Sequence, residues 1–113
     1  MGNSDRVRED GQLTVRVEHD GDALVVSAFG ELDLSNAKTL EAELRRAIGG
    51  DASGVVLDLG GVRFVDSSGL RVLLLTAKQS LRNGGRLRLL RGSAPVDQAI
   101  EVAGVEASLP LAD

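Results

Sequence analysis

Apolar and polar residues alternate along the first part of the chain. Leu13, Val15 and Val17 are separated by polar residues, and this two-residue period is typical of a strand with one buried face. Residues 20–22 have turn chemistry, and the mostly apolar residues 23–29 follow as a second strand. The pattern predicts an antiparallel hairpin over these two strands, preceded by a loose polar leader over residues 1–11.

Two longer segments have the spacing of amphipathic helices. Residues 36–48, which Ser35 can cap, and residues 68–82 each carry apolar side chains three or four positions apart. Glycines at 49–50 and 84–85 end the two helices. The positions expected to be buried are Ala37, Leu40, Leu44, Ala47 and Ile48 in the first helix, and Leu70, Leu73, Leu74, Ala77 and Leu81 in the second.

The remaining segments indicate a chain in which strands and helices alternate. Residues 55–59 form a nearly continuous apolar run, typical of a central strand covered on both faces. Residues 86–90 alternate again, and residues 93–103 predict a short helix with Pro95 in its first turn. Residues 105–109 are compatible with a final edge strand. Because helices separate the later strands, the order favours an α/β fold with a largely parallel sheet after the hairpin.

Composition and charge narrow the possible functions. The chain has 113 residues, of which 42% are hydrophobic, and this suits one packed domain over residues 12–113. Seventeen acidic against 13 basic residues give a net charge of −4, which disfavours nucleic-acid binding. The sequence has no cysteine, so thiolate chemistry is excluded. It contains neither a signal peptide nor an apolar run that could span a bilayer, so we expect a cytoplasmic protein without a membrane partner.

The segment from residue 55 to residue 70 carries the most informative chemistry. An apolar strand leads into a loop that contains Gly60 and Gly61, and the loop delivers Asp66, Ser67 and Ser68 to the start of a helix. The free N–H groups and the positive dipole end of a helix start can accept a phosphate on a serine. The same residues also fit an ordinary helix cap, so local chemistry alone leaves both interpretations open.

This segment resembles the signature of the STAS domain, the fold of bacterial anti-sigma factor antagonists. The similarity is carried by Asp58-Leu59 and by FVDSSGL at residues 64–70, with weaker matches at GELD (30–33), at Gly84-Gly85, and at Pro95 before a helix that ends in Gly104-Val105. The resemblance extends over about residues 12–109. It implies a STAS-like mixed sheet of four to five strands, with helices packed mainly on one side.

The resemblance also implies a function. Members of the family bind an anti-sigma factor that is a serine kinase, and the unphosphorylated antagonist thereby frees the sigma factor. The kinase phosphorylates the serine after the aspartate, the complex separates, and a serine phosphatase resets the switch. In this chain the phosphorylation site would be Ser67. The residues predicted to contact the partner are Asp33, Asp66, Ser67, Ser68, Gly69, Arg71, Val72 and Leu75.

Three of these residues allow more than one interpretation. Arg71 stands where many family members have a small residue, so it either affects partner choice, pairs with the phosphate or is simply solvated. Val72 and Leu75 lie off the apolar stripe of their helix. They form a patch facing a partner, or they pack under a neighbouring element.

Other sites and functions find less support in the sequence. His19 is the only histidine and has no second ligand at metal spacing, so neither a metal nor a catalytic triad is predicted. The phosphate-binding Gly-Lys-Ser/Thr motif is missing, and no cofactor is expected. Asp58 is similar to the phosphoacceptor of receiver domains, but no acidic pair follows the first strand. The sequence predicts a binding switch and not an enzyme. The alternatives are a STAS accessory subunit of a transport or stress-signalling assembly, a receiver-like domain and a small-ligand-binding domain.

Overall fold

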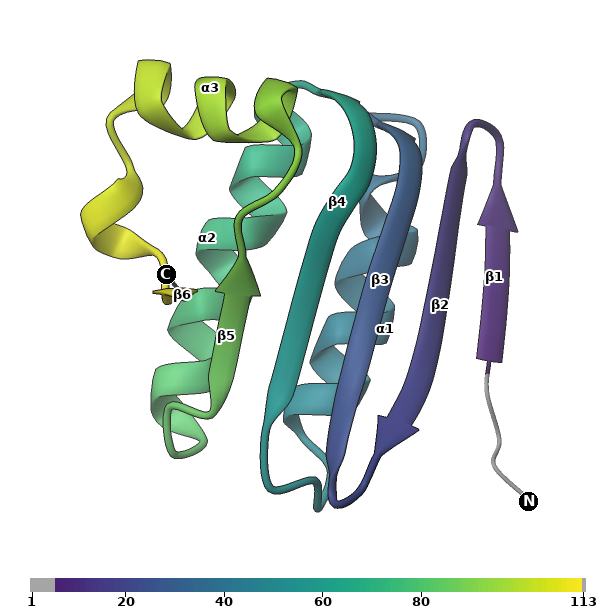
Figure 1. Cartoon of the computed structure of the whole chain (residues 1–113), viewed down its shortest axis with the longest axis vertical. Helices are drawn as coiled ribbons and strands as arrows, with labels where there is room; N and C mark the ends of the chain where they lie inside the picture. The colour runs from purple at the N-terminus through teal and green to yellow at the C-terminus, as the bar shows by residue number, and fades with distance from the viewer. Residues whose placement is uncertain (1–5, 113) are drawn as a thin grey trace.

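A mixed sheet backed by helices gives the chain its architecture (Figure 1). The structure is a computed structural model, and it describes residues 6–112. Over these residues the strands are β1 (Arg6–Asp10), β2 (Leu13–Asp20), β3 (Ala23–Leu32), β4 (Val55–Val65), β5 (Leu87–Leu90) and β6 (Leu111–Ala112). The helices are α1 (Ala37–Ile48), α2 (Ser67–Arg82), α3 (Ala94–Ala103) and the short 3₁₀ helix η1 (Glu106–Ser108).

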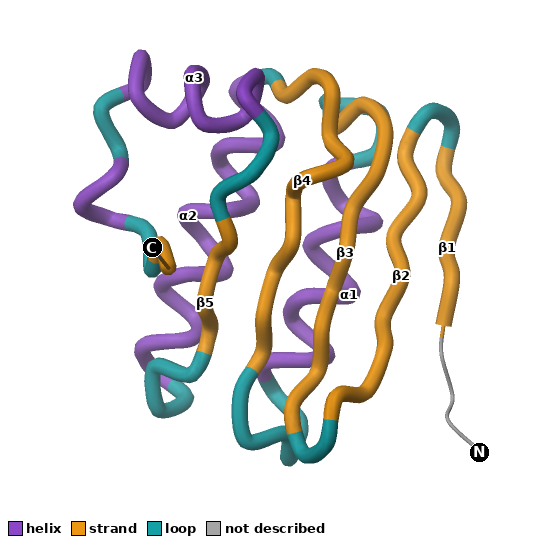
Figure 2. Tube along the Cα trace, viewed as in Figure 1, coloured by secondary structure: helices purple, strands orange, loops and turns teal. Residues whose placement is uncertain are grey.

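The strands lie in the sheet in their order along the chain, from β1 to β6. The pairs β1–β2 and β2–β3 are antiparallel, whereas the pairs β3–β4, β4–β5 and β5–β6 are parallel. Parallel neighbours need a crossover, and α1, α2 and the α3–η1 segment supply one each. α1 and α2 lie behind the sheet, and α3 lies across the end at which β4 finishes (Figures 1 and 2). The predicted α/β class, with a hairpin followed by parallel strands, is confirmed.

The core lies between the sheet and the two longer helices. All five positions expected to be buried in α1 are buried. In α2 the prediction is partly wrong, because Leu81 is 77% exposed and Val72 is only 4% exposed. The buried stripe of α2 is rotated because this helix packs against α1 as well as against the sheet. Facing these helices, the largest buried strand side chains are Leu13, Val15, Val26, Leu32, Leu57, Leu59 and Val62.

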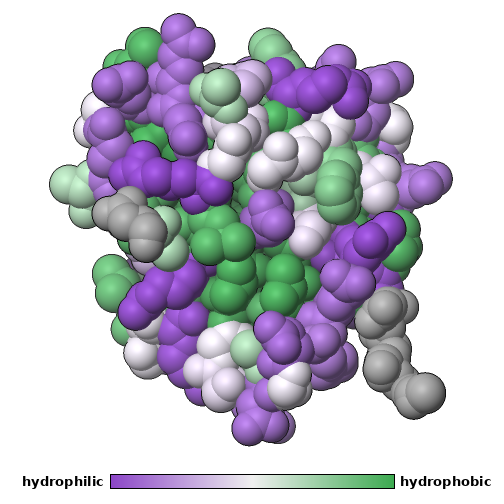
Figure 3. Space-filling view, in the orientation of Figure 1, coloured by the Kyte–Doolittle hydropathy of each residue, from purple (hydrophilic) through white to green (hydrophobic). Residues whose placement is uncertain are grey.

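The opposite face of the sheet carries both polar and apolar side chains (Figure 3). Val25 and Val56 are register partners on that face and are half-buried. Phe29 packs against Gly61, where a Cβ would come within 2.4 Å of the ring. The guanidinium of Arg16 lies 5.8 Å from the centre of the same ring, in cation–π contact. This second apolar layer explains why residues 23–29 lack the strict alternation of β2.

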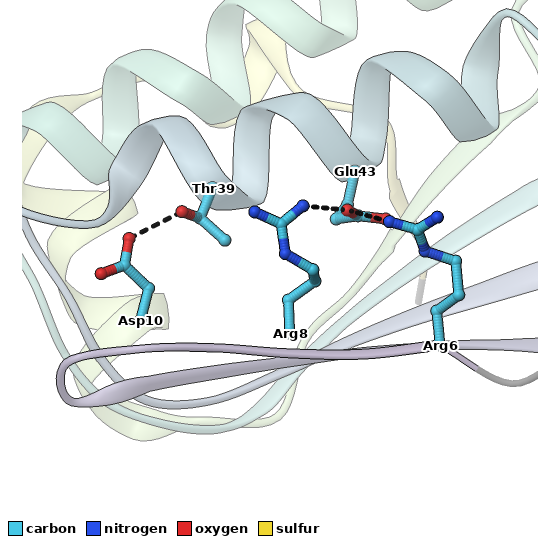
Figure 4. Close-up of polar contacts among 5 residues, drawn as sticks. All are labelled: Arg6, Arg8, Asp10, Thr39 and Glu43. Carbon is cyan, nitrogen blue, oxygen red and sulfur yellow. Dashed lines mark hydrogen bonds and ion pairs between the residues drawn. The ribbon is translucent and has the colours of Figure 1, made fainter.

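The predicted loose leader is wrong where the structure describes it, because residues 6–10 form the edge strand β1. The inner face of β1 is polar: Arg6 and Arg8 contact Glu43, and Asp10 accepts a hydrogen bond from Thr39 (Figure 4). Since this strand has no apolar alternation, its sequence gave no sign of a strand. Residues 1–5 of the expected leader lie outside the described residues.

The expected last strand over residues 105–109 is also wrong. Residues 106–108 form η1, and Leu109 is buried in the core at 8% exposure. The chain then pairs with β5 through the two-residue strand β6, beyond Pro110. Over residues 6–112 the sheet therefore has six strands, one or two more than the four to five that the sequence predicts. Within residues 6–112, no helix combines the length and the hydropathy needed to cross a membrane.

Candidate functional site

The junction between β4 and α2 places a serine at the first position of a helix. β4 ends at Val65, and Asp66 has extended backbone angles and caps α2. One carboxylate oxygen of Asp66 accepts hydrogen bonds from the backbone N–H groups of Ser68 and Gly69, at 2.9 and 3.1 Å. Ser67 is therefore the first helical residue, and its side chain is exposed while its neighbour does the capping.

The second carboxylate oxygen of Asp66 ties this junction to another loop. It accepts a hydrogen bond from the backbone N–H of Leu34, at 3.1 Å. The backbone N–H of Asp66 in turn donates to the carbonyl of Leu32, at 3.2 Å. β3 and β4 are parallel, so the segments that follow them emerge at the same edge of the sheet. The β3–α1 loop and the start of α2 thus form one continuous surface.

Residues 33–36 of the β3–α1 loop are held by their own polar side chains. Asp33 accepts hydrogen bonds from the backbone N–H of Ser35 at 3.0 Å and from its hydroxyl at 2.6 Å. Asn36, which is 1% exposed, accepts from the backbone N–H of Asp33 and donates to the carbonyl of Glu31. Asn36 occupies the cap position of α1, so the prediction that Ser35 caps this helix is wrong. The contacts fix Asp33 beside Leu34, in the loop that bonds to Asp66.

Gly69 lets the first turn of α2 approach the sheet closely. A Cβ at this position would lie 2.6 Å from Cγ2 of Val65 and 2.8 Å from Cγ of Leu32. Real Cβ atoms do not come this close to other heavy atoms, so a side chain here would push α2 outwards. Gly69 is itself buried and positions Ser67, so it offers a partner little surface.

The other residues predicted to contact a partner differ in their exposure. Arg71 is exposed, and Ser68 is half-buried. Leu75 is 41% exposed and lines a groove between α1 and α2 together with Glu41 and Gln79. Val72 is buried at 4%, so its prediction as a partner contact is wrong and its packing alternative is right.

The surface of the site also includes residues that the sequence did not indicate. Leu34 is 78% exposed beside the Asp66 contact, and Phe64 is 49% exposed near the end of β4. Leu34 lies outside the local motif, because the Leu34–Asp66 contact joins positions 32 residues apart. Phe64 begins the FVDSSGL match, but the resemblance does not place it among the partner contacts. Asp58 is half-buried, and its carboxylate accepts the N–H of Gly60 at 2.8 Å. Among residues 6–112, no three His, Cys, Asp or Glu side chains come together as a metal site.

Comparison with known proteins decides the family. The family model of the STAS domain matches residues 14–113. The chain belongs to the STAS domain family. BtrV of Bordetella bronchiseptica, whose name places it among anti-sigma factor antagonists, is 37% identical to this STAS chain over 90 residues, which cover 80% of the chain and 78% of BtrV.

Solved structures agree with this assignment. An anti-sigma factor antagonist from Mycobacterium paratuberculosis superposes on this STAS domain with a TM-score of 0.78 and 26% identity, over 88% of this chain and 84% of the other. The antagonist SpoIIAA in its unphosphorylated form superposes with a TM-score of 0.70 and 25% sequence identity, over 88% of both chains. SpoIIAA from Bacillus in its phosphorylated form superposes with a TM-score of 0.66 and 24% sequence identity, over 88% of this chain and 91% of the other. The predicted resemblance and the STAS fold are confirmed, and the relatives' names agree with the predicted function.

Proposed function

We propose that this STAS domain is an anti-sigma factor antagonist that is switched off by phosphorylation of Ser67. Its relatives are named anti-sigma factor antagonists, and SpoIIAA has been solved with and without phosphate. The observation that carries the proposal for this chain is the exposed hydroxyl of Ser67 on a helix start that Asp66 already caps. The partner is an anti-sigma factor with serine kinase activity, and a serine phosphatase reverses the modification.

The surface around Ser67 suits a protein partner. The apolar side chain of Leu34 stands exposed on one side, and the exposed side chains of Ser67 and Arg71 continue the surface along α2. The backbone beneath them is held by the three hydrogen bonds that Asp66 accepts. A rigid backbone under a small exposed patch reduces the entropy lost when a partner docks.

The chemical step adds charge and leaves the fold intact. The Ser67 hydroxyl oxygen attacks the γ-phosphorus of a nucleoside triphosphate, the bond to the bridging oxygen breaks, the diphosphate leaves, and a base of the kinase takes the proton. Ser67 caps nothing in α2, so its modification does not remove a contact that stabilises the helix. The domain therefore stays folded in both states and differs in surface charge by about −1.5 to −2.

The added charge opposes binding because this surface is already acidic. Asp33 and Asp66 both lie at the junction that carries Ser67. A partner that fits the bare hydroxyl meets both the bulk of the phosphate and an added negative charge that it has no group to balance. A penalty of ~3 kcal/mol weakens binding by about 100-fold, since each ~1.4 kcal/mol is a factor of ten. The modified antagonist then releases its partner, which returns to the sigma factor.

Binding measurements with the anti-sigma factor test the proposal. We expect Ser67→Ala to bind as tightly as the unmodified protein and to take up no phosphate. We expect Ser67→Asp to bind at least about tenfold more weakly, because its single charge mimics only part of the phosphate. Ser68→Ala is the matched control, since it removes the neighbouring hydroxyl and leaves the phosphoacceptor. Phosphate on the Ser67→Ala protein, or equal affinity of the phosphorylated and unphosphorylated wild type, would refute the proposal.

A further inference from the structure

A phosphate on Ser67 needs a partner group, and the helix backbone does not offer the usual one. The N–H groups of Ser68 and Gly69 donate to the carboxylate of Asp66, at 2.9 and 3.1 Å. The N–H of Leu70 donates to the backbone carbonyl of Asp66, at 3.1 Å. Three of the donors that would otherwise receive an anion at a helix start are therefore occupied. The occupying group is itself a carboxylate, which repels a phosphate.

One cation in the first half of α2 is well placed to balance the phosphate. Arg71 is four positions after Ser67, and both residues lie within the helix, so their side chains project from the same face. Arg71 is exposed, and within residues 6–112 it makes no hydrogen bond or ion pair. An acidic group on the N-terminal side of a basic group at this spacing is the favourable orientation. The planar guanidinium also matches the geometry of phosphate oxygens.

Other basic residues near the site are less suitable. Arg63, on β4, is already 3.9 Å from the carboxylate of Glu31. Lys78 is eleven positions after Ser67 along α2, about three turns away. Lys38, in the first turn of α1, is exposed and begins a different helix at the same edge of the sheet. Lys38 is thus the competing candidate that an experiment must separate from Arg71.

We propose that Arg71 pairs with the phosphate of phosphorylated Ser67 across one turn of α2. The pair forms only in the modified state, since the free hydroxyl carries no charge. It offsets part of the repulsion from Asp33 and Asp66, and it holds the phosphate against the surface of α2. Arg71 would thus bind the phosphate in the modified state and have no corresponding contact in the unmodified one. The inference rests on the proposed phosphorylation of Ser67.

Phosphorus NMR on protein carrying phosphoserine at position 67 tests the pairing. The phosphoserine is introduced during translation, so the test does not need the partner kinase. A guanidinium beside the phosphate favours its dianion and moves the titration midpoint of the phosphorus signal to lower pH. We expect this midpoint to be about 0.15–0.4 pH unit lower in the wild type than in Arg71→Gln, the shift that corresponds to one charge pair on a helix surface.

Conservative and matched variants sharpen the result. We expect the titration midpoint of Arg71→Lys to lie between those of the wild type and Arg71→Gln. A lysine keeps the positive charge but lacks the planar guanidinium that can donate two parallel hydrogen bonds. Lys38→Gln and Lys78→Gln are the controls, and each should titrate like the wild type. The difference between wild type and Arg71→Gln should shrink in ~1 M salt, where the screening length falls to about 3 Å. The Nε–H signal of Arg71 should also move on phosphorylation.

Two outcomes would overturn this inference. One is the same midpoint in the wild type and in Arg71→Gln, and the other is a shift produced by Lys38→Gln in place of Arg71→Gln. Either result would leave the affinity test of Ser67 unaffected, since that test measures partner binding and not the phosphate's surroundings. Conversely, equal partner affinity of the phosphorylated and unphosphorylated wild type would refute the switch without changing the phosphorus titration.

Discussion

Two carboxylates in this domain join segments that lie far apart in the chain, and they do so in opposite surroundings. Glu43 of α1 is 2% exposed and accepts hydrogen bonds from Arg6 and Arg8 of β1, at 3.1 and 2.9 Å (Figure 4). Asp66 at the start of α2 is half-buried and accepts three backbone N–H groups. The first site is a cluster of ion pairs between the side chains of Arg6, Arg8 and Glu43, called the clasp below. The second is a helix cap in which a carboxylate binds backbone N–H groups.

The difference separates a structural role from a functional one. Glu43 is satisfied only while two half-exposed arginines reach it, so its contacts bind the edge strand to α1. Asp66 is satisfied by N–H groups that the fold leaves without other partners, so Ser67 has no task in the helix and is free for modification. A carboxylate that caps the helix beside Ser67 thus separates the stability of the domain from the proposed phosphorylation of Ser67.

The largest effect is expected from removing the arginines of the clasp while keeping their bulk. The variant Arg6→Met/Arg8→Met leaves the Glu43 carboxylate beneath β1 without a partner. Stranding a buried charge in this way costs about 3–5 kcal/mol, and we expect a loss near ~3 kcal/mol because β1 is an edge strand that can move aside. Urea denaturation, read as the free energy of unfolding, measures the loss.

The matched control adds Glu43→Met to that variant. Replacing a buried ion pair by apolar side chains of similar size is often neutral or stabilising, so the triple variant should recover most of the lost stability. Recovery would show that the cost arises from the stranded charge and not from the altered strand. A loss below about 1 kcal/mol in the double variant, or a triple variant no more stable than the double, would contradict a structural role for the clasp.

The same contrast shows what the sequence could and could not reveal. The capping contacts of Asp66 in α2 lie within three residues, so a local motif was enough to place Ser67 at a helix start. The contacts of Glu43 span 35 and 37 residues, and in the sequence its arginines are indistinguishable from solvated charges. The sequence therefore predicts a leader over residues 6–10 where the structure has an edge strand, and it predicts a narrower sheet than the structure has.

The helical period had a similar limit. It predicts the buried stripe of α1, in which all five expected positions are buried. For α2 it gives the spacing but not the rotation, because Val72 is buried and Leu81 is exposed in a helix that packs against both α1 and the sheet. A single sequence shows how often apolar residues recur on a helix, whereas a second packing partner shifts which of them are covered.

An intermediate effect is expected from adding one methyl group where α2 meets the sheet. In Gly69→Ala the new Cβ would meet Val65 and Leu32 at 2.6 and 2.8 Å. Overpacking of this kind costs about 1–3 kcal/mol, and the first turn of α2 must shift with Ser67. Gly50→Ala is the matched control, because its nearest atom lies at an ordinary 3.5 Å. Calorimetry should show a lower Tm for Gly69→Ala only, and equal stability of both variants would mean that close packing does not position Ser67.

The smallest loss of stability is expected from replacing one carboxylate oxygen of Asp66 by an amide nitrogen. In Asp66→Asn the amide oxygen still accepts from Ser68 and Gly69, and asparagine is as good a helix cap as aspartate. The NH₂ group, however, now faces the N–H of Leu34, so the hydrogen bond at 3.1 Å is lost. We expect a loss of about 1 kcal/mol, typical of one hydrogen bond, with the change concentrated in the β3–α1 loop.

Amide hydrogen exchange tests that expectation directly, because it reports loop opening residue by residue. The Leu34 amide should exchange faster in Asp66→Asn, while the amides of Ser68 and Gly69 keep the protection of the wild type. Asp33→Asn is the matched control, since it makes the same chemical change in the same loop without touching the Leu34 contact. If both variants left Leu34 unchanged, the second oxygen of Asp66 would not hold the loop, and Glu43 alone of the two carboxylates would join distant segments.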